Sequence, residues 1–394
     1  MKDWRFAQLG DLCTITAGGT PSRSNPGYFS GDIPWVKISD MLQGRVVSTE
    51  ESITELALKN STAKLLPAGT VLISIFATIG RTAVLGVDAT TNQAIAGITP
   101  RDPEVLSPLY LRRYLDSVVS TLERKARGAA QVNINSTILK SLPIPVPSQA
   151  EQQKVVEALD RADELRAKRR EALARLDDLT QSIFLDMFGH PVRNPRAWPM
   201  ARIEDVADVQ GGLQLSGSRS RHPIEVPYLR VANVHRGRLD LTEIKTLRAS
   251  EAEVSRTSLR DQDLLIVEGH GNPEEIGRAA LWDGSVSPCV HQNHLIRARF
   301  NPASIVPVFA SYYVNSPGGR RHLLRAGKTT SGLNTISVAD VRSTPIATPP
   351  LDLQHTFARR VANVEVLKAA HRGSLAELDG LFASVQDRAF RGLL

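Results

Sequence analysis

Residues 148–189 read SQAEQQKVVEALDRADELRAKRREALARLDDLTQSIFLDMFG, and no proline or glycine interrupts this stretch before Gly189. It follows a proline-rich segment that contains Pro143, Pro145 and Pro147. Apolar side chains recur every three or four residues, which predicts one long amphipathic helix. At about 1.5 Å per residue the helix would be roughly 55–60 Å long. Such a helix either crosses a large core or links two separate bodies.

The chain contains this pattern twice. Residues 351–394 match the long helix without a gap, and the globular sequence before each helix repeats in the same order. The matched globular landmarks are Trp4 and Trp198, Gly18-Gly19 and Gly211-Gly212, Ile33–Ile38 and Val226–Val231, Ile79-Gly80-Arg81 and Ile276-Gly277-Arg278, and Pro143-Ile144 and Pro345-Ile346. Matches of this kind indicate a tandem duplication, in which each copy is a globular unit followed by a helix.

Each globular unit has the pattern of an α+β domain. In the first unit we expect short strands near residues 33–38, 70–75, 83–87 and 94–99, and one helix near residues 107–126. The predicted fold is therefore two tandem α+β domains separated by two long antiparallel, coiled-coil-like helices, with a pseudo-twofold repeat. The expected divisions are residues 1–147 and 190–348 for the domains, and residues 148–189 and 349–394 for the helices.

We expect the two helices to pack through an apolar seam. The predicted seam residues are Val155, Leu159, Ala162, Leu165, Leu173, Leu176 and Ile183 in the central helix, and Phe357, Val361, Val364, Leu367, Leu375, Leu378, Phe382 and Val385 in the C-terminal helix. Polar residues lie at the centre of both, namely Arg166, Arg169, Lys368 and His371. We expect Leu165 and Leu367 to fill the seam there while the basic stems extend outward. The alternative is that this polar centre binds an acidic patch on a partner protein.

The composition of the chain is that of a globular protein with a basic charge balance. Its 394 residues exceed one ordinary core, so two domains are expected. The formal net charge is +7 and arginine predominates among the basic residues, which suits a polyanionic partner. No apolar run is long enough for a membrane span, and residues 1–6 lack the core of a signal peptide. A cytoplasmic location is expected.

Three clusters resemble catalytic or binding motifs but lack the required context. They are Gly327-Lys328-Thr329, which resembles the end of a phosphate-binding loop; His291 and His294 near Cys289; and Asp240, Glu243 and Lys245. The first has no strand-to-helix setting. The histidines fall in a predicted strand and would lie on opposite faces. The last lies in a polar turn that we expect to be solvated. The sequence thus predicts no catalytic residue, no metal site and no cofactor.

The candidate binding residues lie on polar and basic loops. Hydroxyls, amides and arginines on exposed loops are the groups that contact phosphates and base edges, although ordinary loops contain them too. The candidates are Thr20, Ser22, Arg23, Lys37, Arg81, Lys125, Arg127 and Gln131 in the first half, and Arg219, Arg221, Arg230, Arg278, Arg321, Lys328 and Asn334 in the second. These loops differ between the halves far more than the scaffold does. This pattern is typical of two domains that share one scaffold and recognise different sequences.

In this order and in duplicate, the motifs resemble the specificity subunit of a type I restriction-modification system. They are Trp4 followed by Leu9, Asp11 and Leu12; Gly18-Gly19-Thr20-Pro21; Ile33-Pro34-Trp35-Val36; Ile79-Gly80-Arg81; Asn92-Gln93; Leu142-Pro143-Ile144-Pro145; Gln152-Gln153; His291-Gln292-Asn293-His294; and Pro345 to Pro350. The resemblance covers essentially the whole chain. One departure is Gly211-Gly212-Leu213-Gln214, where the first half has Gly-Gly-Thr-Pro.

This resemblance implies a non-enzymatic DNA-binding protein. Residues 1–147 and 190–348 would be target recognition domains, each reading one half of a bipartite site in double-stranded DNA. The two helices would recruit two methyltransferase (M) subunits, and restriction and translocase (R) subunits would complete the assembly. Methylation, ATP use and cleavage would belong to those partners. Two other classes stay open: a two-headed scaffold that binds proteins or glycans, and a self-contained DNA-modifying enzyme.

Overall fold

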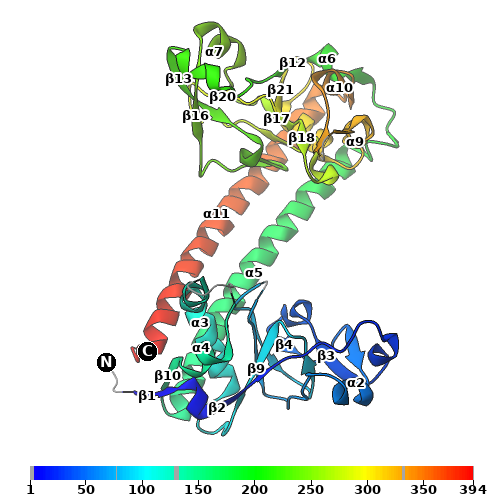
Figure 1. The fold of residues 1–394 in the computed structure, drawn as a ribbon. Helices are drawn as coiled ribbons and strands as arrows, with labels where there is room; N and C mark the ends of the chain where they lie inside the picture. The colour runs from blue at the N-terminus through cyan, green and yellow to red at the C-terminus, as the bar shows by residue number, and fades with distance from the viewer. Residues whose placement is uncertain (1–3, 77, 128–132, 331–332, 394) are drawn as a thin grey trace. The chain divides into compact units, whose positions relative to one another are not determined.

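The computed structural model describes residues 4–76, 78–127, 133–330 and 333–393. The chain forms two compact units, the first made of Met1–Arg170 with Arg372–Leu394 and the second of Glu171–His371. Both long helices are present, α5 as Gln149–Phe188 and α11 as Leu351–Phe390. Each unit therefore combines one α+β domain with a segment of both helices, and in each unit the two segments lie side by side (Figure 1). None of the helices described is both long and apolar enough to cross a membrane.

The first unit is built on a five-stranded sheet in the order β2-β9-β6-β7-β4, with a three-stranded sheet β5-β3-β8 and a pair β1-β10. Strand β6 is the central strand of this sheet, and all four of its residues are buried. The predicted strands correspond to β3, β6, β7 and β9, and the predicted helix to α3. The bounds are β1 Arg5–Gln8, β2 Cys13–Ala17, β3 Ile33–Val36, β4 Arg45–Val46, β5 Glu51–Ile53, β6 Val71–Ser74, β7 Thr82–Leu85, β8 Thr90–Thr91, β9 Ile95–Pro100, β10 Pro143–Val146, α1 Leu9–Leu12, α2 Glu55–Lys59, α3 Pro108–Arg127 and α4 Ser136–Lys140.

The second unit repeats this topology, with β12-β21-β17-β19 in place of β2-β9-β6-β7, β16-β13-β20 in place of β5-β3-β8, and β11-β24 in place of β1-β10. It also contains a pair β14-β15 and a sheet β18-β23-β22. The bounds are β11 Met200–Arg202, β12 Ala207–Gly211, β13 Ile224–Leu229, β14 Val234–His235, β15 Arg238–Leu239, β16 Lys245–Ala249, β17 Leu264–Val267, β18 Gly269–His270, β19 Ala279–Leu281, β20 Val290–His291, β21 Leu295–Phe300, β22 Lys328–Thr330, β23 Leu333–Thr335, β24 Pro345–Ala347, α6 Ile203–Val206, α7 Glu251–Thr257, α8 Pro307–Asn315, α9 Arg321–Ala326 and α10 Val338–Arg342.

A buried glutamine joins the start of each long helix to its domain. Gln152 accepts a hydrogen bond from the backbone N–H of Ser107 at 2.9 Å, and its amide donates to the carbonyls of Val105 at 2.8 Å and Pro147 at 3.1 Å. The second unit has the same arrangement at Gln354, which bonds Val306, Ser304 and Pro349. Both glutamines are buried, with 1% and 0% of their surface exposed. The carbonyl oxygen and both N–H groups of each side-chain amide thus have hydrogen-bond partners inside the protein.

The inner face of each long helix follows a spacing of three and four residues, with one step of seven after the central cation of each helix. In α5 this places Val155, Leu159, Ala162, Arg166, Leu173, Leu176, Thr180, Ile183 and Met187 on the inner face, and in α11 it places Phe357, Val361, Val364, Lys368, Leu375, Leu378, Phe382 and Val385 there. The prediction that Leu165 and Leu367 fill the seam is wrong, since they are 50% and 52% exposed. The inward-facing position at the centre of each helix is a cation instead, Arg166 in α5 and Lys368 in α11. The helical period places these residues on the inner face, although they are charged.

In the first unit the cation is Arg166 of α5. It donates to Asp379 of α11 at 2.6 Å and to Asp163 at 2.7 Å, and its guanidinium lies 4.4 Å from the ring centroid of Phe382. The core of this unit contains Val155 near the start of α5 together with Ala389 near the end of α11. The two segments of this unit therefore run antiparallel, and the ion pair ties one to the other.

In the second unit the cation is Lys368 of α11. Its ammonium lies 2.7 Å from Asp177 of α5 and 2.8 Å from Glu365. Burial alone would lower the pKa of Lys368, but the hydrogen bonds with these two acids raise it above its usual value. Lys368 corresponds to Arg166 in the repeat and Asp177 to Asp379, so the two units contain the same ionic arrangement. The expectation that the basic stems extend outward is wrong for both cations.

We expect the Arg166–Asp379 pair to contribute about 1 kcal/mol to the stability of the first unit, because the arginine is mostly buried while the acid is half exposed. The measurement is a double-mutant cycle with Arg166→Met and Asp379→Asn, using urea unfolding. Methionine keeps the apolar contact with Phe382, so the coupling energy isolates the ion pair. A coupling energy of zero would contradict a role for this pair in joining the helices.

Candidate nucleic-acid interface

The first candidate residue, Arg23, lies on the loop between β2 and β3 with its side chain 54% exposed. Its guanidinium lies 4.1 Å from the ring centroid of Phe29 and 5.0 Å from that of Trp35. The Trp35 indole N–H donates to the carbonyl of Gly19 at 3.0 Å, which ties the loop to the domain. Arg23 also donates to Glu51 at 2.6 Å. Its guanidinium is thus held in one orientation while most of it faces solvent.

Glu51 connects Arg23 to a second candidate, Lys37. The Lys37 ammonium donates to Glu51 at 2.9 Å and to Glu50 at 2.6 Å. Hydrogen bonds from Arg23 and Lys37 lower the pKa of Glu51, so this carboxylate stays charged at neutral pH. The neighbouring Ser22 is exposed and bonds Ser24, whereas the Thr20 hydroxyl is buried and has no hydrogen-bond partner among the residues described.

In the second unit the corresponding arginine is Arg219. It makes two hydrogen bonds with Glu253, at 3.1 and 3.2 Å, and its side chain is 13% exposed. Glu253 also accepts from the backbone N–H of Ser250 in the capping box that starts α7. The Ser250 N–H and Arg219 lower the pKa of Glu253 to about 2. Arg219 lines a pocket of about 510 Å³ with Ser220, Arg248 and others, while Arg221 is exposed.

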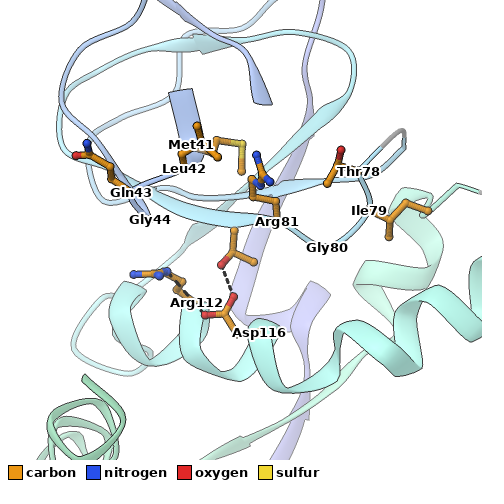
Figure 2. Close-up of a pocket in the computed structure, with 11 residues that line it drawn as sticks. Met41, Leu42, Gln43, Gly44, Thr78, Ile79, Gly80, Arg81, Arg112 and Asp116 are labelled. Carbon is orange, nitrogen blue, oxygen red and sulfur yellow. Dashed lines mark hydrogen bonds and ion pairs between the residues drawn. The ribbon is translucent and has the colours of Figure 1, made fainter. Parts of the chain in front are cut away.

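The structure places the two arginines of the Ile-Gly-Arg motif differently. Arg81 lines a pocket beside α3 in the first unit (Figure 2). Its counterpart Arg278 is only 8% exposed and donates to Glu275 at 2.9 Å and to the carbonyl of Val231 at 3.1 Å. Arg278 is therefore part of the interior of its domain, and we leave it out of the proposed surface.

The remaining candidates differ in how much of each residue the structure describes. Arg230 bonds Glu243, and Arg321 is exposed at the start of α9. The backbone of Lys328 belongs to β22 and that of Asn334 to β23, which pairs with β18. The side chain of Lys328 and those of Lys125 and Arg127 at the end of α3 are outside the described residues, as is all of Gln131.

The acids that hold these arginines were missed in the sequence. The sequence predicts a solvated Glu243, which is 65% exposed, and assigns no role to Glu51 or Glu253; each of the three acids nevertheless pairs with a candidate cation. The spacing Ser250-x-x-Glu253 was a usable signal, because it marks a helix N-terminus and so places the carboxylate. Glu51 and Glu243 carry no local signal, since their partners lie 28 and 13 residues away in the chain.

The residues that resemble catalytic motifs make contacts that support the fold. The ring nitrogens of His291 lie 3.2 Å from the carbonyl of Thr257 and 3.4 Å from that of Gln210. His294 lies 3.3 Å from Glu268, apart from His291. Both cysteines are free and buried, and within the described ranges no three His, Cys, Asp or Glu residues are grouped to hold a metal. Lys328 begins a strand of a hairpin, which is not the setting of a phosphate-binding loop.

Comparison with known proteins then shows which family the chain resembles. A sequence profile described as type I restriction modification DNA specificity domain matches residues 1–175. The EcoKI specificity subunit of Escherichia coli is 25% identical over 428 residues, which cover 100% of this chain and 89% of that protein. The MjaIX specificity subunit of Methanocaldococcus jannaschii is 28% identical over 260 residues, 60% of this chain and 59% of that protein. The chain is thus similar to type I restriction specificity subunits over its whole length.

Solved chains from type I restriction-modification systems share the fold. A chain from a study of assembly and conformational transition in a type I restriction-modification system superposes with a TM-score of 0.62 at 21% identity, covering 100% of this chain and 99% of that one. The specificity subunit from M. genitalium superposes with a TM-score of 0.52 at 13% identity, covering 98% and 96%. At such low identity these likenesses concern the fold. They support the α+β domains with long helices as the common architecture of the family.

Proposed function

We propose that this specificity subunit recognises a bipartite site in double-stranded DNA, with one α+β domain reading each half. The observation that carries the proposal is the duplication itself, in which one scaffold is repeated with different loops. Arg23 and Arg219 lie on these loops, and both are oriented by a carboxylate of their own domain. A guanidinium that is already oriented loses less conformational entropy when it contacts a base edge or a phosphate.

The chemistry of modification belongs to partner subunits in this proposal. The α5 and α11 helices dock two methyltransferase (M) subunits, and restriction and translocase (R) subunits join in the full complex. Methyl transfer, ATP-driven translocation and cleavage are carried out by these partners. The role of this chain is to place them on the DNA, and residues such as His291 and Glu268 serve its folding.

The test is methylation mapping of genomic DNA from cells that express the full chain with its methyltransferase subunit. We expect methylated adenines in one split sequence. Arg23→Ala and Arg219→Ala should each relax one half of that sequence and leave the other half unchanged, since each residue lies in a separate unit. The control is Arg202→Ala, an exposed arginine on β11, which should leave both halves unchanged. Methylation without a split sequence would contradict the proposal.

Two measurements separate this function from the other classes. Affinity for the mapped duplex should fall steeply with rising salt, because phosphate contacts release counterions, whereas a protein- or glycan-binding scaffold would have no such DNA affinity. Methylation or cleavage by the purified chain alone would instead identify a self-contained DNA-modifying enzyme.

A further inference from the structure

A hollow of about 430 Å³ opens in the first unit beside β4, the edge strand of the five-stranded sheet. Its walls are the turn before β4 with Gln43 and Gly44, the turn before β7 with Thr78 and Arg81, and helix α3. Figure 2 shows Arg81 and Thr78 on one side of the start of β7, and Arg112 of α3 on the other. Two cations from separate elements therefore line one opening.

Both guanidinium groups have N–H groups without a hydrogen-bond partner among the residues described. Among the residues described, Arg81 makes no ion pair and no side-chain hydrogen bond. Arg112 lies 3.9 Å from Asp116, and its buried Nε has no hydrogen-bond partner in the described part of the chain. A buried donor without a partner costs free energy until an acceptor reaches it.

Gly44 is needed for the position of Arg112. It has a φ of +71°, and a Cβ there would lie 2.4 Å from Nη2 of Arg112 and 2.6 Å from its Cζ. The guanidinium thus lies directly against the backbone of the turn, and any larger residue would displace it.

The hollow is electrostatically positive. Its one acid, Asp116, accepts a hydrogen bond from the Thr82 hydroxyl and lies 4.0 Å from Arg113 as well as 3.9 Å from Arg112. Burial raises the pKa of Asp116, while Thr82, Arg112 and Arg113 act in the opposite direction. The acid is engaged inside the domain, and the Arg81 cation remains uncompensated.

The second unit contains the same motif in a closed form. Glu275 stands where the first unit has Thr78, and it pairs with Arg278 at 2.9 Å and with Arg236 at 3.7 Å. Ser311 stands where the first unit has Arg112. In this copy an internal acid neutralises the arginine of the Ile-Gly-Arg motif. The shared scaffold thus folds with the acid present, and its replacement by Thr78 leaves Arg81 available to an external anion.

We propose that this hollow binds a phosphate group of the DNA backbone, with Arg81 as the main contact and Arg112 as the second cation. The inference rests on the proposed function and adds a phosphate site in the first unit, where the second unit has the Glu275–Arg278 pair instead. A planar guanidinium matches two phosphate oxygens at once. The Gln43 amide and the Thr78 hydroxyl supply further donors at the same opening. The contact positions the domain on the duplex without reading its sequence.

The test compares Arg81→Ala and Thr78→Glu in the full chain assembled with its methyltransferase subunit. Thr78→Glu recreates the acid of the second unit and should neutralise Arg81 while leaving it in place. For both variants we expect about tenfold weaker binding to the mapped duplex, and a plot of log affinity against log salt that is less steep by about 1. The methylated sequence should not change. Arg5→Ala, an exposed arginine on β1, is the matched control and should have no effect.

Three results would overturn the inference. Unchanged affinity and salt dependence in both variants would remove the phosphate site, while a split methylated sequence in the same cells would still support the proposed function. A changed methylated sequence would assign Arg81 to base reading. Binding of pyrophosphate or a nucleoside triphosphate without DNA, lost in Arg81→Ala, would make the hollow a site for a small anion. Absence of salt-dependent DNA affinity in the wild type would instead defeat the proposed function.

Discussion

Acidification from pH 6.5 to pH 4 is expected to lower the free energy of unfolding of the second unit by about 3 kcal/mol through His291 alone. This ring is completely buried, and burial lowers the pKa of His291 to about 4, with the charge of Arg297 acting in the same direction. Between these pH values the unfolded chain binds a proton at the ring and the folded chain does not. The proton therefore stabilises the unfolded state, and stability is lost as the pH falls.

The measurement is urea unfolding of the wild type and His291→Gln at pH 7, 5.5 and 4.5. Glutamine does not titrate, so the stability difference between the two proteins should shrink as the pH falls. The matched control is His294→Gln, which removes a half-exposed histidine of the same segment. A difference that stays constant over this range would mean that the ring binds its proton equally in the folded and unfolded states, and a difference that grows as the pH falls would mean that His291 is already charged in the folded state.

Gln152→Leu is expected to destabilise the first unit by about 3–5 kcal/mol. The substitution leaves the buried carbonyl of Pro147 and the partly buried N–H of Ser107 and carbonyl of Val105 without their partner, and a buried group of this kind costs about 1–3 kcal/mol. Leucine fills most of the same volume, so lost hydrogen bonds account for the effect. Hydrogen exchange followed by mass spectrometry measures the loss separately for peptides of each unit.

The repeat supplies a strong comparison for this prediction. Gln354→Leu should destabilise the second unit by a similar amount and leave the exchange of the first unit unchanged, and Gln152→Leu should do the reverse. Gln153→Leu, at an exposed neighbouring position that bonds Glu157, should change stability by less than about 0.5 kcal/mol. Equal effects of Gln152→Leu and Gln153→Leu would show that the buried amide does not join the helix to its domain.

The tandem duplication and the helical period of the apolar residues can be recognised in the amino-acid sequence alone. The duplication, the limits of α5 and α11 within one or a few residues, and strands such as β6 follow from apolar spacing, proline positions and matched landmarks. These signals are local, since each depends on residues close together in the chain. The same applies to the repeated polar centre of the helices, whose existence the sequence already revealed.

The partners of the polar side chains were decided by contacts between distant segments. At the centre of the helices we expected Leu165 inside, and the folded protein buries Arg166 because Asp379 lies opposite, 213 residues further along the chain. Arg81 and Arg278 share one motif, and only the folded domains reveal that Glu275 neutralises the second while the first faces an open hollow. Charge compensation depends on which acid comes within a few ångströms, and no local pattern encodes that distance.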